Sequence, residues 1–379
     1  MFYPDFNAFS IELILFIVIG FLLIIKITWL FQRNSKILFF KETEKNSRFS
    51  PPVSVIICAR NEGDNLTNFL PEILTQDYEN YEVIVVNDCS YDNTDDVLRE
   101  FSNVFPNLKA ITVKEDDYYK HGKKFALMVG IKGAKNEYLV LTDADCKPAS
   151  SQWLKKMAAG FDGGKEIVLG YGPYLPEKGI LNKLIRYDAF LIGIKYLSAA
   201  LRKKPYMGVG RNLAYKKELF FKSKNFSKHY HLVSGDDDLF INQVATTNNT
   251  SIIIDKDAFT YSIPKKSWKE WKLQKGRHLT TAPHYNSRTK TMLSMDIIIN
   301  LLFWSLLIAG LFFKPTLGIS LISFLIIIIL KYIILINVAK KLNEKKIIGL
   351  FWLWDFLLIL LYPFFNYSKR IFESSKWMN

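Results

Sequence analysis

Four long apolar runs are the feature that most constrains this chain. One lies near the N-terminus and three lie in the last third, over residues 11–31, 297–313, 317–338 and 349–365. Each run approaches the length of about 20 residues with which a helix crosses the hydrocarbon core of a bilayer. The sequence therefore predicts membrane-spanning helices on both sides of a central block, residues 51–265, that reads as a soluble domain.

The first apolar run is either an uncleaved anchor or a secretory signal. A signal has a basic leader, a short apolar core and a cleavage site with small residues. Residues 1–10 contain no Lys or Arg, and the basic residues Arg33, Lys36 and Lys41 follow a long apolar stretch. This pattern favours an anchor over residues 1–31 and a basic linker over residues 32–50, on the cytoplasmic side.

Basic residues also predict the orientation of the C-terminal helices, which we expect within residues 291–366. Lysine pairs at 340–341 and 345–346 separate the third and fourth runs and favour a cytoplasmic loop there. The tail, residues 367–379, is basic as well, and an aspartate and a proline interrupt the last run. A re-entrant or interfacial helix is therefore the alternative for that last segment.

The net charge of +14 raises the question of the partner. Many basic residues flank the apolar runs, so anionic lipid headgroups explain them more simply than nucleic acid does. The three cysteines, Cys58, Cys89 and Cys146, lack the spacing of metal ligands and fall in or just after predicted strands. Free, buried thiols fit a central block on the cytoplasmic face of a multi-pass protein of the cell membrane.

The central block alternates short β-branched runs with amphipathic stretches, which predicts an α/β domain with a mostly parallel sheet. The expected strands cover residues 53–57, 82–86, 108–113, 138–142 and 167–171, and the expected helices cover residues 65–75, 94–101 and 123–134. Ligands of such sheets bind at the carboxyl ends of the strands. The residues that follow the strands are therefore the candidates for a site.

Polar residues follow three of these strands. Residues 59–62 (ARNE) follow the first, Asp88 follows the second, and Asp143 and Asp145 follow the fourth. A single aspartate at a strand end is often a helix cap or a turn former. Three polar strand ends that meet at one edge of a sheet indicate a site.

Asp143 and Asp145 form an Asp-x-Asp pattern directly after a buried strand. The tripeptide alone occurs by chance in many chains, so its position carries the argument. Two carboxylates together with substrate phosphates are a usual way in which proteins hold Mg²⁺ or Mn²⁺. Asp145, with Asp143 beside it, is therefore the predicted metal ligand.

Residues 52–285 resemble the inverting family 2 glycosyltransferases, which have a Rossmann-like GT-A fold. Residues 53–66 (VSVIICARNEGDNL) are similar to the opening strand and Asn-Glu turn of that family, and residues 85–90 (VVNDCS) are similar to its second-strand Asp motif. The resemblance implies a nucleotide-sugar donor. Its uridine would lie against Ala59, Arg60 and Glu62, and Asp88 would bond the uracil or the ribose.

Two further segments resemble motifs that lie near the nucleotide in this family. Residues 121–127 (HGKKFAL) are similar to the family's Gly-Lys-x-x-Ala-Leu-Asn segment, with Met128 where Asn is usual. Lys123 is the matched lysine near the nucleotide, although a solvated helix start is the simpler structural explanation. Asp143 and Asp145 match the family's Asp-x-Asp motif.

Two segments resemble motifs that lie on the acceptor side of the site in this family. Residues 208–215 (GVGRNLAY) resemble the family's Gly-x-Asn-x-Ala-Phe/Tyr segment, which implies that Gly210 and Asn212 lie beside the acceptor. Residues 234–239 (SGDDDL) resemble its Gly-Glu/Asp-Asp motif, whose second acid is the catalytic base. The alignment selects Asp237, and Asp236 stays open as the alternative.

Residues 274–278 (QKGRH) are similar to the Gln-x-x-Arg-Trp segment of members that form chains. Gln274 and Arg277 would face the donor, and Arg277 would lie near its pyrophosphate. His278 replaces the Trp that offers an aromatic wall to the acceptor, which leaves processive synthesis in doubt. The alternative for residues 266–290 is a plain interfacial helix with Trp and Lys at the headgroups.

The resemblance thus implies a metal-dependent transfer from a UDP-sugar or similar nucleotide sugar to a membrane-associated glycan or lipid. One alternative is a single addition to a polyprenyl phosphate or a glycolipid, which the length of the product would reveal. The other is a membrane protein that binds the nucleotide without turnover. The sequence does not name the sugar or the acceptor, because fold similarity does not settle function.

Overall fold

The computed structural model describes residues 6–41, 49–115, 122–223, 226, 230 and 232–368. Part of the predicted basic linker (residues 42–48), the histidine at position 121 and the basic tail from residue 369 onward lie outside the described residues.

A seven-stranded sheet forms the centre of the soluble domain, with strand order β3-β2-β1-β4-β7-β6-β8. Its strands are β1 (Val53–Ala59), β2 (Tyr81–Asp88), β3 (Leu108–Val113), β4 (Tyr138–Asp143), β6 (Ile167–Gly170), β7 (Leu213–Lys216) and β8 (Thr250–Ile253). Strands β3, β2, β1 and β4 run parallel to one another, and β6 runs parallel to β8. Strand β7 runs antiparallel to both of its neighbours, β4 and β6. The expectation of a mixed, mostly parallel sheet is confirmed.

Helices cover both faces of this sheet because alternate residues of each strand point to opposite sides. Val55 and Ile57 of β1 share a core with α2 (Gly63–Leu74), α3 (Thr94–Val104) and α5 (Trp153–Ala159). Ile56, the residue between them, belongs to the core beneath α4 (Lys123–Gly133) and α6 (Ile180–Leu201). The mostly apolar β1 sequence is therefore explained by burial on both faces.

Shorter elements complete the edge that carries the site. They are β5 (Cys146–Pro148), η1 (Gly210–Asn212), α7 (Lys217–Lys222), α8 (Asp238–Val244), η3 (Lys256–Ala258) and β9 (Thr260–Ser262). Strands β5 and β9 pair antiparallel as a separate two-stranded sheet. This small sheet holds the chain just after Asp145 in place.

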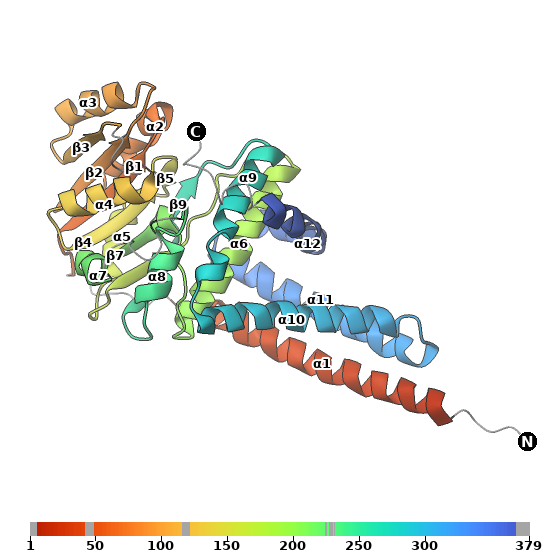
Figure 1. Cartoon of the computed structure of the whole chain (residues 1–379). Coiled ribbons are helices and arrows are strands. Elements are labelled where there is room, and N and C mark those ends of the chain that lie inside the picture. Colours follow the sequence, from red (N-terminus) through yellow and green to blue (C-terminus); the bar gives the residue numbers. More distant parts are fainter. Residues whose placement is uncertain are drawn as a thin grey trace, which may run out of the picture.

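The long apolar helices lie apart from the sheet (Figure 1). They are α1 (Phe6–Phe39), α10 (Ser287–Gly310), α11 (Lys314–Lys341) and α12 (Phe351–Ser368), and α12 lies beside α9 (Trp268–Leu279) and α6. Within the described residues, four helices are long and apolar enough to cross a membrane, namely Glu12–Asn34, Ser287–Gly310, Lys314–Lys341 and Lys345–Ser368. The expectation of such helices at both ends of the chain is confirmed.

Ion pairs join these helices to α6 and to one another. Asp296 of α10 lies 3.3 Å from Arg33 of α1 and 3.4 Å from Lys195 of α6. Lys331 of α11 lies 2.5 Å from Asp355 of α12. Charged groups among apolar helices are costly unless paired, so these contacts fix which helix faces meet.

Candidate active site

A cavity of about 670 Å³ lies beside the carboxyl ends of β1 and β4. Most of the predicted site residues line it, namely Arg60, Glu62, Lys123, Asp143, Asp145, Gly210, Asp236, Asp237, Gln274, Arg277 and His278. They come from segments more than 200 positions apart in the sequence. The fold thus brings the strand-end acids, the Asp236–Asp238 segment and α9 to one place.

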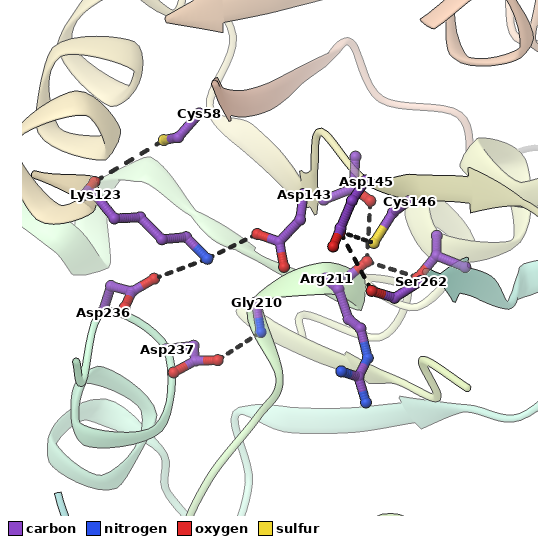
Figure 2. A network of polar contacts seen from close by, with 12 residues as sticks. Cys58, Lys123, Asp143, Asp145, Cys146, Gly210, Arg211, Asp236, Asp237 and Ser262 are labelled. Carbon is purple, nitrogen blue, oxygen red and sulfur yellow. Dashed lines mark hydrogen bonds and ion pairs between the residues drawn. The ribbon is translucent and has the colours of Figure 1, made fainter. Parts of the chain in front are cut away.

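Lys123, the first residue of α4, connects two of the acidic segments (Figure 2). Its ammonium lies 2.7 Å from Asp143 Oδ1 and 3.4 Å from Asp236 Oδ2. Burial alone would lower the pKa of Lys123, but the two carboxylates outweigh it and raise the pKa well above its ordinary value. Lys123 is therefore a fixed positive charge inside the site, not a solvated helix start.

Asp143 and Asp145 bring two carboxylates together at the end of β4. Their oxygens and the Cys146 sulfur lie within 4.8 Å of one another. Burial, and then the negative charge of Asp143, raise the pKa of Asp145. Two crowded carboxylates of this kind suit a hard divalent cation, which would relieve their repulsion.

Cys146 is the one member of this group that sequence reasoning did not include. Its Sγ lies 3.4 Å from Asp145 Oδ1, and burial raises the pKa of the thiol well above its usual range. A neutral thiol is a poor ligand for Mg²⁺ or Mn²⁺, which prefer oxygen. Within this group, the oxygen donors that such a metal would prefer are those of Asp143 and Asp145.

The three consecutive acids that precede α8 occupy three different environments. Asp237 Oδ2 accepts the backbone N–H of Gly210 at 2.7 Å, and Oδ1 accepts the N–H of Asp238 at 2.7 Å. Burial, and then the charges of Asp236 and Asp238, raise the pKa of Asp237 to about 7. Asp237 therefore exchanges its proton near neutral pH.

Its neighbours behave differently. Burial would raise the pKa of Asp236, but the ammonium groups of Lys123 and Lys124 outweigh it and leave the pKa lowered. Asp238 Oδ2 accepts hydroxyl hydrogen bonds from Thr281 at 2.5 Å and from Tyr285 at 2.7 Å. The Asp236 carboxylate thus lies beside cations, and the Asp238 carboxylate accepts two hydroxyl hydrogen bonds within the fold. Asp237 is left as the group suited to accept a proton.

Helix α9 places the QKGRH segment against the cavity. Ser267 and Glu270 form a capping box at its start, and Trp271 packs edge-on against Phe365 of α12, with ring centroids 4.9 Å apart. Gln274, Arg277 and His278, which belong to the predicted interfacial segment, line the cavity.

His278 faces this cavity in a positively charged setting. Desolvation by the surrounding protein, and then the charge of Arg277, hold the pKa of His278 well below its usual range. The imidazole is therefore neutral and offers one hydrogen-bond donor and one acceptor to a ligand.

Three predicted residues do not line the cavity. Ala59 and Asp88 are fully buried at the ends of β1 and β2. The Asn212 amide is fully buried as well, where its Nδ2 donates to the carbonyls of Tyr171 and Ala258 at 2.8 Å and its Oδ1 accepts from Trp153 Nε1 at 3.1 Å. The side chain of Asn212 thus ties together the strand end at Tyr171, the turn at Ala258 and the indole of Trp153.

The cavity also contains residues that sequence reasoning missed. Arg211 and Tyr174 line it, and the Arg211 guanidinium carbon lies 4.5 Å from the centre of the Tyr174 ring. Arg211 lies between Gly210 and Asn212 in the same glycine segment, so its place in that motif could have identified it as a candidate from the sequence. Tyr174 had none, because the loop after β6 shows no distinctive pattern.

Comparisons with known proteins agree with this architecture. A model of the Glycosyl transferase family 2 matches residues 54–222. The chain is 34% identical over 144 residues to glycosyltransferase AglE of Haloferax volcanii, which covers 37% of this chain and 45% of that protein. It is 32% identical over 93 residues to a poly-beta-1,6-N-acetyl-D-glucosamine synthase of Staphylococcus epidermidis, which covers 24% of this chain and 21% of that protein. The matches span less than half the length of these relatives.

A solved structure resembles the whole arrangement. The mannosyltransferase PcManGT of Pyrobaculum calidifontis, determined with GDP-Man and Mn²⁺, superposes with a TM-score of 0.56 at 18% identity and covers 89% of this chain and 99% of that one. At this identity the likeness concerns the fold. The family match shows a family 2 glycosyltransferase domain over residues 54–222, and the structural likeness shows a GT-A-like fold.

Proposed function

We propose that this protein transfers a sugar from a nucleotide sugar to an acceptor at the membrane, with inversion at the anomeric carbon and with Asp237 as the base. One observation carries the proposal. Asp237, whose pKa is raised to about 7, is held by Gly210 in the same cavity as the Asp143 and Asp145 pair. A base and a group for the leaving phosphates are the two parts that such a transfer needs.

The reaction follows from these positions. The acceptor hydroxyl gives its proton to the Asp237 carboxylate while its oxygen attacks the anomeric carbon of the donor. The bond from that carbon to the diphosphate oxygen breaks, and the nucleoside diphosphate leaves with the electron pair. One displacement inverts the anomeric centre, so no covalent sugar–enzyme intermediate is required.

Positive charge beside the leaving group would lower the barrier further. Lys123 and Arg277 line the cavity and place cationic donors where a diphosphate would accumulate charge. Asp143 and Asp145 would hold a Mg²⁺ or Mn²⁺ ion, which when bound would neutralise the departing diphosphate. Lys123 is already oriented by Asp143 and Asp236, so little reorganisation is needed.

The donor in this proposal is a UDP-sugar or a similar nucleotide sugar. Arg60 and Glu62 line the cavity at the end of β1, next to the fully buried strand ends at Ala59 and Asp88. Burial raises the pKa of Glu62. A hydrogen bond from Asn65 opposes this effect, whereas the nearby acids add to it, and the pKa stays above its ordinary value. Such a carboxyl suits recognition of sugar or base hydroxyl and amide groups.

The acceptor would reach the site from the membrane side. His278, Gly210 and Trp271 line the same cavity as residues of α6, α10 and α12. A glycan growing at the membrane and a lipid that receives a single sugar both fit such a site. The catalytic domain would lie in the cytoplasm, where nucleotide sugars are made.

The direct test incubates the purified full chain in detergent with a panel of nucleotide sugars and Mn²⁺ or Mg²⁺, and measures the nucleoside diphosphate released. Release with one donor and not with others identifies that donor. Absence of release with every donor, in protein that still binds uridine or guanosine diphosphate, would instead support a nucleotide-binding role.

A further inference from the structure

Arg211 is a rigidly held cation in the cavity (Figure 2). Its Nε donates to the carbonyl of Gly172 at 2.7 Å, and its guanidinium stacks on Tyr174. Its backbone carbonyl accepts hydrogen bonds from Thr142 at 3.0 Å and from Thr260 at 2.6 Å. Because both ends of the residue are fixed, the guanidinium has a defined position and loses little entropy on binding a ligand.

The charge of Arg211 has no carboxylate partner among the described residues. The ion pairs of cavity-lining cations join Lys123 to Asp143 and Asp236, Lys275 to Asp188, and Lys195 to Asp296, and none includes Arg211. The side chain points away from Asp143 and Asp145, the acids that face the leaving diphosphate (Figure 2). A partly buried guanidinium that has no carboxylate partner among the described residues is suited to a phosphate or carboxylate that a ligand supplies.

The same cavity continues along an apolar wall. Ile185, Ala189 and Ile192 lie on one face of α6 over about two turns, and Leu293 of α10 joins them. Helix α10 is itself long and apolar enough to cross a membrane. A ligand with an alkyl chain could therefore lie against this wall while its head faces Asp237.

We infer that the acceptor is a lipid that carries both an anionic group and a free hydroxyl, with the anion on Arg211, the hydroxyl at Asp237 and the chain along α6 and Leu293. The inference rests on the proposed function, since it assigns the acceptor of that reaction. The hydroxyl oxygen bonds to the anomeric carbon, its proton passes to Asp237, and the nucleoside diphosphate leaves.

The need for a hydroxyl follows from the base. A phosphate monoester is already an anion at neutral pH and would attack without losing a proton, so Asp237 would have no task. A phosphodiester or a diphosphate linked to a sugar keeps its charge on Arg211 and still offers a hydroxyl. Both a bilayer phospholipid and a lipid-linked sugar diphosphate have this chemistry.

The test measures binding by calorimetry to the full chain in detergent, without donor. Four probes are compared: dioctanoyl phosphatidylglycerol, a farnesyl diphosphate-linked N-acetylglucosamine, farnesyl phosphate, and the uncharged dioctanoylglycerol. We expect the three anionic lipids to bind at least about tenfold more tightly than dioctanoylglycerol, the size that one charge-assisted contact supplies. Arg211→Gln should remove this preference and Arg211→Lys should keep part of it.

Two further variants separate recognition from folding. Ile192→Trp should weaken binding of every lipid because it fills the apolar wall, whereas Ile359→Trp, at an exposed position of α12, should not. Arg99→Gln, which removes an exposed arginine of α3, is the control for charge. Thermal unfolding of each variant reports whether it is folded. Equal affinity for charged and uncharged lipids, or an unchanged preference in Arg211→Gln, would overturn the inference.

A transfer experiment with the donor that releases nucleotide then distinguishes the sources. Label on phosphatidylglycerol identifies a phospholipid acceptor, and label on the farnesyl diphosphate sugar identifies a lipid-linked sugar; either result supports the inference. Label on farnesyl phosphate, or on none of the lipids while the donor is turned over, overturns it. If no donor is turned over, the proposed function fails, and the binding measurements still decide whether Arg211 recognises an anionic lipid.

Discussion

The backbone N–H of Gly210 donates to Asp237 Oδ2 across 2.7 Å, and this contact joins the glycine segment to the acidic segment in the centre of the cavity. A Cβ atom at position 210 would lie 3.4 Å from Asp237 Oδ2 and 3.6 Å from Lys123 Nζ. A side chain at position 210 would therefore begin in van der Waals contact with both groups, and the glycine keeps that space free. The contact also orients the carboxylate proposed as the base.

Asp237→Asn should reduce transfer to acceptor by about 100- to 10,000-fold, because the amide keeps the shape of the side chain and cannot accept the proton. Nucleotide binding should persist. The measurement compares kcat with nucleoside diphosphate affinity, and Asp96→Asn, at an exposed position of α3, is the matched control. Loss of transfer in Asp236→Asn, with transfer retained in Asp237→Asn, would move the base by one residue.

The rate should rise with pH through about 7 and then level off. Burial, Asp236 and Asp238 raise the pKa of Asp237 to about 7, against the opposing charge of Lys123. Below that pH Asp237 carries a proton and cannot act as a base, so kcat/KM should fall about tenfold for each unit of decrease. The residual rate of Asp237→Asn should lack this limb. A profile that is flat from pH 5 to 8 would contradict the assignment.

Asp145→Ala should abolish metal-dependent turnover, because one carboxylate with the substrate phosphates holds a hard cation poorly. Asp143→Ala should do so less completely. Chelator should inactivate the native enzyme, and added Mn²⁺ should restore it. Turnover and Mn²⁺ affinity are measured together, and Asp162→Ala, in the turn after α5, serves as the control. Full activity in excess chelator would show that the two acids have another role.

Asn212→Ala should lower stability, because it leaves the Trp153 indole and the carbonyls of Tyr171 and Ala258 without their partner. Each unsatisfied buried group costs about 1–3 kcal/mol. The midpoint of thermal unfolding should therefore fall, and Asn248→Ala, in an exposed loop, should leave it unchanged. An unaltered midpoint with a raised acceptor KM would return Asn212 to the acceptor side.

A cysteine at Phe312, between α10 and α11, should react with an impermeant thiol reagent in intact cells, and one at Lys346, before α12, should react only after permeabilisation. Phe312 is 81% exposed and therefore suits this labelling. The expectation follows from the lysines between α11 and α12, at residues 340–341 and 345–346, which favour a cytoplasmic side for that loop. Both cysteines are introduced into a chain whose native cysteines are replaced. The reverse pattern would place the catalytic domain outside the cell.

Local pattern was enough to predict the parallel half of the sheet. Strands β1, β2, β3 and β4 are short apolar runs between polar turns, and their ends carry Arg60, Glu62, Asp143 and Asp145, which do line the cavity. The long apolar helices at both ends of the chain could be predicted from local pattern as well. These features depend on residues that are near one another in sequence, so a single pass along the chain finds them.

Helix α6 could not be predicted in the same way. It is apolar around much of its circumference, and its charges at Arg186, Asp188 and Lys195 look like surface residues in isolation. In the structure they pair with Glu344, Lys275 and Asp296, each at least 87 positions away. A charge whose partner is that distant has no local signature.

The division between sequence and structure is clearest in the three acids at 236–238. Three consecutive carboxylates at these positions are evident from the sequence alone, as are the glycine segment and the Asp-x-Asp pattern elsewhere in the chain. The folded chain is needed to see that Lys123 and Lys124 lower the pKa of Asp236, that Thr281 and Tyr285 bind Asp238, and that the pKa of Asp237 is raised to about 7. Proton affinity depends on desolvation and on charges a few ångströms away, and folding alone determines which groups those are.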